Sequence, residues 1–129
     1  MNKIYRYFLF FGFWTILIVS LYIYGKIRIN EMKDNKQITI GRITDYGNGG
    51  SGDVILHFNF DYNNKTYYSK RGSQIARNNY NYFDGKYFPV IFSSIDPDNN
   101  QLLVFPDDFK SWEMPFPDSL NWVIQYQKW

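Results

Sequence analysis

The sequence predicts a mainly β protein of the α+β type: an N-terminal transmembrane helix, then a small five-stranded antiparallel sheet or partly open β-barrel with a short helix and a C-terminal helix. Three observations support this. Residues 7–25 carry no charge, residues 54–62 alternate apolar and polar side chains, and four more short apolar segments are separated by turn-forming residues. We divide the chain into an N-terminal transmembrane anchor at 1–25, a juxtamembrane connector at 26–36 and a β-barrel-like domain at 37–129.

The uncharged run begins at Tyr7 and ends at Gly25. Its 19 residues would span about 28 Å as a helix, close to the hydrocarbon thickness of a bilayer. Tyrosines stand near both ends, as in an aromatic belt. A cleaved signal peptide would have a shorter apolar core and small residues before the cut, whereas this run ends in the bulky sequence SLYIYG. The pattern favours an uncleaved single-pass anchor over a signal peptide or a buried core helix.

Two signals disagree on the orientation of the anchor. Two Lys or Arg residues precede the apolar run and four lie between it and residue 37, and this count favours a cytoplasmic domain. A very short basic tail before an apolar run is, however, the usual form of a signal anchor that exports the domain attached to its C-terminal end. We expect the domain on the extracytoplasmic side.

Composition excludes several classes of function. The formal net charge is +2, but residues 1–36 hold six Lys or Arg against two acids, so residues 37–129 hold eight against ten. A slightly acidic domain argues against binding to nucleic acid. The chain contains no cysteine, which excludes disulfides, thiolate metal sites and cysteine nucleophiles.

The first half of the domain predicts three strands. Residues 37–44 form a plausible first strand, and the glycine-rich residues 45–53 form a turn. In the second strand the apolar residues share one face: Val54, Leu56, Phe58, Phe60 and Tyr62. The sequence YNNK turns the chain into a partner strand that begins at Lys65, which predicts a hairpin.

The second half predicts a helix, two strands and a terminal helix. Ser73 caps the expected short helix, whose apolar residues continue to Phe83, and Gly85 ends it. The fourth strand covers 86–94, where Pro89 suggests an edge or a bulge, and the fifth covers 101–105. After an irregular segment at 107–117, a terminal helix is expected with one stripe: Leu120, Val123, Ile124 and Gln127.

Two stretches carry a resemblance, VILHFNFDYNNKTYY and GKYFPVIFSSIDPDNNQLL. With the membrane helix before them, they resemble a loosely defined bacterial family of membrane-anchored small β-domain proteins of unknown function. The resemblance implies the fold and the anchor. For the anchored protein we expect a place in the bacterial inner membrane. It implies no catalytic residue. The chain departs from the family pattern in its glycine loop at 47–52 and in its tail after Asp107.

The chain contains few residue patterns typical of a catalytic or metal-binding site. Asp96, Asp98 and Asn100 alternate like the first ligands of a calcium loop, but Gln101 stands where that loop needs glycine. Asp-Pro followed by Asp-Asn-Asn is what a turn requires on its own account. His57 is the only histidine and stands on the polar face of the second strand. We therefore expect no catalytic residue, no metal, no cofactor and no enzymatic activity.

The tail at 106–129 is crowded with aromatic residues. It either packs across the open side of the barrel or forms a patch for a partner. The candidate partner-binding residues are Trp112, Trp122, Phe109 and Phe116. The sequence favours a membrane-anchored module that binds an unidentified protein, such as an envelope-assembly accessory or a toxin-immunity protein. The alternative is a structural accessory subunit of a larger membrane complex, joined through its transmembrane helix.

Overall fold

The computed structural model describes residues 2–50 and 52–127. Met1, Ser51, Lys128 and Trp129 lie outside the described residues, so the anchor, the glycine loop and the tail are each described only in part. In chain order the elements are α1 (Lys3–Asp34), β1 (Lys36–Asn48), β2 (Asp53–Tyr62), β3 (Lys65–Ala76), the 3₁₀ helix η1 (Arg77–Tyr82), β4 (Tyr87–Ser93), β5 (Asn100–Leu102), α2 (Pro106–Lys110) and the 3₁₀ helix η2 (Asp118–Tyr126).

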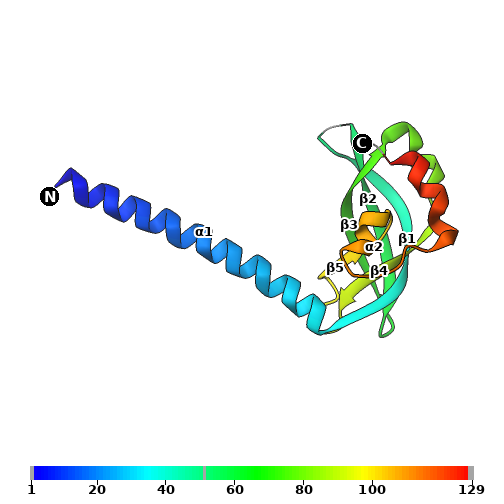
Figure 1. Ribbon diagram of the computed structural model, residues 1–129, viewed down its shortest axis with the longest axis horizontal. Helices are drawn as coiled ribbons and strands as arrows, with labels where there is room; N and C mark the ends of the chain where they lie inside the picture. Colours follow the sequence, from blue (N-terminus) through cyan, green and yellow to red (C-terminus); the bar gives the residue numbers. More distant parts are fainter. Residues whose placement is uncertain (1, 51, 128–129) are drawn as a thin grey trace.

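The five strands form one antiparallel sheet in the order β3-β2-β1-β4-β5. The sheet curls into a nearly closed barrel, so the predicted fold class is confirmed. Figure 1 shows α1 projecting away from the barrel and joining it where β1 begins. The described part of the glycine loop, η1 and η2 lie at the other end of the barrel, which we call the far end.

Helix α1 continues well beyond the uncharged run. Its 32 residues correspond to about 48 Å. The connector at 26–36 is therefore helical as far as Asp34. Within the described part of the chain, α1 is the one helix long and apolar enough to span a membrane or to serve as a signal sequence.

The two central strands differ in how well their alternation predicted burial. In β2 the apolar face predicted from Val54 to Tyr62 is buried as far as Phe60, and Tyr62 is half-buried against the core. In β1 both sets of alternate residues contain isoleucine, and Ile43 points inward while Ile38 and Ile40 are 51% and 57% exposed. Gly41 faces the same side as Ile43, and a Cβ there would lie 2.6 Å from Val90 Cγ2. Close packing against β4 therefore selects the inner face.

The hairpin prediction is confirmed, but the short helix begins later than predicted. Asn63 and Asn64 have φ of 51° and 61°, the left-handed pair typical of a tight two-residue hairpin. Strand β3 continues to Ala76, and the Ser73 hydroxyl donates to the Val54 carbonyl oxygen at 2.5 Å. Ser73 is thus a strand residue rather than a helix cap, because this bond holds it against β2.

The strands of the second half are shorter than predicted, and Pro89 lies inside the sheet. Strand β4 pairs with both β1 and β5 in continuous register, so both the expected edge and the expected bulge are wrong. The Leu103 N–H donates to the Pro89 carbonyl at 2.9 Å. In an antiparallel strand the N and O of one residue face the same neighbour. The N–H donor that Pro89 lacks would therefore face β5. It would lie opposite Leu103, one residue beyond the end of that strand.

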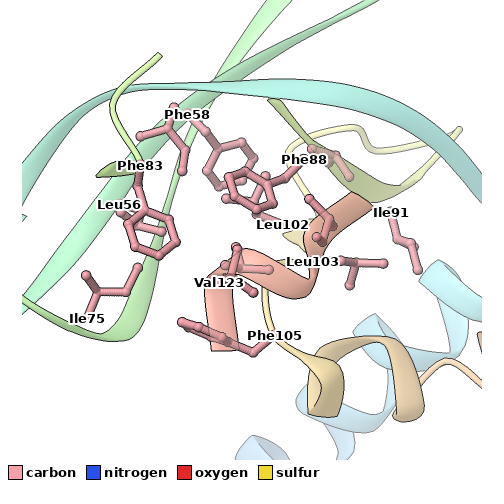
Figure 2. Close-up of a cluster of buried hydrophobic side chains, with 14 of the residues drawn as sticks. Leu56, Phe58, Ile75, Phe83, Phe88, Ile91, Leu102, Leu103, Phe105 and Val123 are labelled. Carbon is pink, nitrogen blue, oxygen red and sulfur yellow. The ribbon is translucent and has the colours of Figure 1, made fainter. Parts of the chain in front are cut away.

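The core fills the barrel and is closed by the tail. Figure 2 shows Val123 of η2 among side chains from the strands, together with Phe83 and Phe105. Because η2 is a 3₁₀ helix, residues three apart share a face. Leu120 and Val123 are buried, whereas Ile124 is 42% exposed. The predicted stripe is therefore correct for Leu120 and Val123 and wrong for Ile124.

Candidate functional site

The turn after β4 binds the end of α1. The Asn99 side-chain amide, buried in the structure, donates to the Arg28 carbonyl oxygen at 2.9 Å. The Arg28 guanidinium lies 3.8 Å from the Asp96 carboxylate. The Ser94 N–H donates to the Asn35 carbonyl at 3.0 Å. The turn makes these contacts with residues 28–35, and they hold the end of α1 against the barrel.

Apolar packing adds to this junction. Met32 is 8% exposed and belongs to the core cluster. Figure 2 shows Ile91 of β4 on the side of the cluster where α1 passes. The end of α1 and the barrel therefore share a core, and the helix leaves the domain in a defined direction.

The acidic pattern of the same turn does not assemble a ligand set. Asn100 donates its side-chain amide to the carbonyls of Pro97 and Asp98 at 3.0 and 3.2 Å, which is local turn bonding. Asp96 faces Arg28. Across residues 2–50 and 52–127 no three His, Cys, Asp or Glu side chains gather where a metal ion could be held.

An ion pair bridges the gap in the barrel between β3 and β5. Arg71 of β3 donates to both carboxylate oxygens of Asp108, at 2.7 and 3.1 Å, and to the Leu102 carbonyl at 2.5 Å. The Asp108 carboxylate also accepts the N–H groups of Val104 and Phe105 at 3.0 and 2.9 Å. It thereby satisfies two backbone N–H groups in the segment that follows β5.

The environment of Asp108 favours its charged form. Burial alone would raise the pKa of this carboxyl group. The hydrogen bonds and positive charge of Arg71, together with the N–H groups of Phe105 and Val104, outweigh burial and lower the pKa below its usual value. Arg71 and Asp108 therefore form a charged clasp that closes the barrel.

The four predicted partner-binding residues divide into two places. Phe109 is 1% exposed and lies in the core, and the half-buried Phe116 packs on it with ring centroids 5.3 Å apart. Trp112 is half-buried near Lys36 at the start of β1, and its indole N–H donates to the Gln101 side chain at 2.9 Å. Of the four, Trp122 alone lies at the far end of the barrel. The structure therefore does not bring the four together on one surface.

Trp122 has one side in the core and one side in a groove. Its ring centroid lies 5.1 Å from that of Phe83, a core residue. On its other side it lines a groove of about 410 Å³, which we call the far-end groove. The lining residues are Asn81, Tyr82, Lys86, Trp122, Gln125 and Tyr126.

Tyrosines from two elements build this groove. Tyr82 of η1 stacks on Tyr126 of η2 with centroids 4.6 Å apart and planes at 17°. Tyr82 is 53% exposed, so much of its ring faces solvent. Lys86 contributes one positive charge, and none of the lining residues within the described part of the chain is acidic. The arrangement suits an aromatic or apolar group that carries a negative charge nearby.

The glycine loop joins the same end of the molecule. The Arg77 guanidinium of η1 donates to the Asn48 side-chain oxygen at the end of β1. Tyr46 contacts the buried Tyr80 with ring centroids 4.4 Å apart. The described part of the loop and η2 therefore flank η1 on either side, as Figure 1 also shows. The loop and η2 thus share one end of the barrel, whereas the segment of the tail around Trp112 lies elsewhere.

Several residues of these sites were not found from the sequence. Tyr82 and Lys86 fell in segments assigned to a helix and a strand, where their exposure was invisible. Arg71 and Asp108 are 37 residues apart, and no local pattern links them. The position of Asn99 could have drawn attention to it. The turn already has enough turn-forming residues without Asn99, so its side chain is free to serve another contact.

Comparison of the chain with protein-family models, with curated proteins and with solved structures gave no match.

Proposed function

We propose that this chain is a single-pass membrane protein whose barrel binds another protein through the far-end groove. It acts without catalysis, in the bacterial inner membrane, with the barrel on the extracytoplasmic side. An envelope-assembly accessory or a toxin-immunity protein would have this form. The observation that carries the proposal is the far-end groove, because it presents Tyr82, Trp122 and Tyr126 on two helices that pack on the barrel core.

Physical reasons favour protein as the occupant. Tyrosine and tryptophan that are half-buried by their own fold lose little conformational freedom on binding, and such residues dominate the energetics of interfaces. The groove is framed by η1 and η2, and both are attached to the barrel core through Tyr80, Leu120 and Val123. A pre-organised aromatic surface binds with a smaller loss of entropy than a mobile one.

Site-specific photocrosslinking in membranes tests this function. A photoreactive amino acid at Gln125, in the groove, should give a discrete protein adduct. The same group at Lys70, exposed on β3 away from the groove, should give none. Lys86→Glu should weaken the Gln125 adduct, because it reverses the charge at the groove. Absence of an adduct at Gln125 would contradict the proposal.

The same experiment separates the alternative function, a structural subunit joined through its membrane helix. Phe11 is 68% exposed on α1 and lies within the apolar run. A photoreactive group at Phe11 that gives the dominant adduct, with nothing at Gln125, would favour the structural subunit over the binding module.

A further inference from the structure

We propose that the turn at 94–99 contacts the membrane interface beside α1 and places the Ile95 side chain among the lipid headgroups. This rests on the proposed membrane anchor and adds a second point of contact between the domain and the bilayer. Three properties of the turn support the contact: its depth, its direction and the character of its exposed side chain.

The depth of the turn is set by its bond to α1. Gly25 is the last residue of the uncharged run, and Arg28 lies three residues further along the helix. Three residues of helix rise about 4.5 Å. The polar interface on each side of the hydrocarbon is roughly 5–7 Å deep. Asn99 donates to the Arg28 carbonyl at 2.9 Å, which places the Asn99 end of the turn at the level of this interface. Ser94, at the other end, is bonded to the Asn35 carbonyl and lies about 15 Å beyond Gly25 along the helix.

The direction of the turn agrees with this depth. Ser94 contacts α1 at its end, through the Asn35 carbonyl, and Asp96 contacts it at Arg28. From Ser94 to Asp96 the chain therefore runs along α1 toward the apolar segment. Arg28 also donates to the hydroxyl of Tyr24 at 3.3 Å. Tyr24 is one of the tyrosines expected at the membrane–water boundary.

The exposed side chain of the turn suits the boundary of a bilayer. Ile95 is 67% exposed, although it lies between residues that are held against α1. The charges of the two segments balance, because α1 contributes Lys26 and Arg28 here and the turn contributes Asp96 and Asp98. The contact therefore depends on the apolar side chain and requires no anionic lipid, so zwitterionic phospholipid is the partner that we infer.

Fluorescence quenching in vesicles tests the contact. The chain has no cysteine, so a single introduced cysteine carries the only label. Full-length Ile16→Cys, Ile95→Cys and Ser119→Cys are labelled with the same NBD fluorophore and reconstituted in phosphatidylcholine vesicles that contain nitroxide-labelled lipids. Ile16 is in the middle of the apolar run. Ser119 belongs to η2. In Figure 1, η2 lies on the side of the barrel turned away from α1.

The three sites give distinguishable outcomes. We expect headgroup nitroxides to quench the label at position 95 several-fold more than the label at 119, and acyl-chain nitroxides to quench the label at 16. Equal quenching at 95 and 119, with strong quenching at 16, would overturn the contact and leave the anchor intact. Weak quenching at 16 would overturn the anchor itself and, with it, this inference.

A second variant shows whether α1 sets the depth of the turn. Asn99→Ala removes the bond to the Arg28 carbonyl but leaves Ile95 in place. With the label at position 95, this variant should show clearly weaker headgroup quenching in phosphatidylcholine vesicles. Unchanged quenching would contradict the role of Asn99 in holding the turn at the interface.

Discussion

The two halves of the aromatic tail differ in what their side chains do. In the first half, around α2, Phe109 is buried and Asp108 closes the barrel, so the segment completes the fold. In the second half, η2 buries Leu120 and Val123 but leaves one side of Trp122 and Tyr126 in an open groove. Aromatic content alone therefore does not identify a binding surface. Phe109 is packed on all sides, whereas Trp122 and Tyr126 each keep one side in the groove, and this unpacked side is what makes a ring available to a partner.

The largest expected difference in stability between the two halves of the tail comes from removing a core ring. Phe109→Ala removes a fully buried side chain and should lower the free energy of unfolding by about 3–5 kcal/mol. Phe116→Ala removes a half-buried ring that packs on Phe109 and should cost about 1 kcal/mol. Urea unfolding of the full-length protein in detergent measures both. Equal, small losses would contradict the assignment of the first half to the core.

The next largest effect concerns the charged clasp. Asp108→Asn removes one partner of a mostly buried ion pair and should destabilise the protein by about 2–4 kcal/mol at pH 7. Asp107→Asn, at an exposed neighbouring position, is the matched control and should change stability little. Urea unfolding at neutral pH again provides the measurement.

The clasp also predicts how stability depends on pH. The pKa of Asp108 is lower in the folded state than in the unfolded state. Its contribution is therefore complete above the unfolded pKa of about 4 and is lost as pH falls through the folded pKa. The difference in unfolding free energy between wild type and Asp108→Asn should shrink with acid below about pH 4. A difference that stays constant down to about pH 2 would show that the charge of Asp108 does not stabilise the fold.

Individual strands and helices show how much of the fold the sequence could predict. Strand β2 was predicted with its buried face, because a strict alternation of period two has one interpretation. The inner face of β1 was not predicted, because isoleucines stand on both of its faces and close packing at Gly41 decides between them. The start of η1 and the exposure of Ile124 on η2 were missed for another reason. The Ser73 bond to Val54 and the 3₁₀ geometry depend on contacts distant in sequence.

The candidate site was predictable only in part, for similar reasons. The excess of aromatic residues marked the tail, and Trp122 was among the residues chosen from it. The other walls of the far-end groove come from η1 and from Lys86, and their exposure depends on how η1 meets η2. Burial of individual rings is a property of packing, and local periodicity carries little information about it in short 3₁₀ segments.

A smaller effect is expected at the bond between the turn after β4 and α1. Asn99→Ala leaves the Arg28 carbonyl without its side-chain donor and should cost about 1 kcal/mol. The loss should appear as faster amide hydrogen exchange in 28–35 and 94–99, with exchange in β2 unchanged. Faster exchange across the whole barrel would mean that Asn99 supports the fold rather than the junction.

The smallest effect on stability is expected in the second half of the tail and the ring stacked on it. Tyr82→Ala removes a ring that is 53% exposed and stacked on Tyr126. It should lower the free energy of unfolding by less than about 1 kcal/mol. A loss as large as that of Phe109→Ala would erase the contrast between the halves, because the groove rings would then be part of the core.

The most direct test combines binding and stability in one pair of proteins. A photoreactive group at Gln125 is introduced into the wild type and into Tyr82→Ala, and adduct yield in membranes is measured beside the melting temperature of each purified protein. We predict a nearly unchanged melting temperature and a several-fold lower adduct yield in the Tyr82 variant, since Tyr82 forms a wall of the groove. An unchanged yield in a folded variant would contradict the claim that the far-end groove binds a protein.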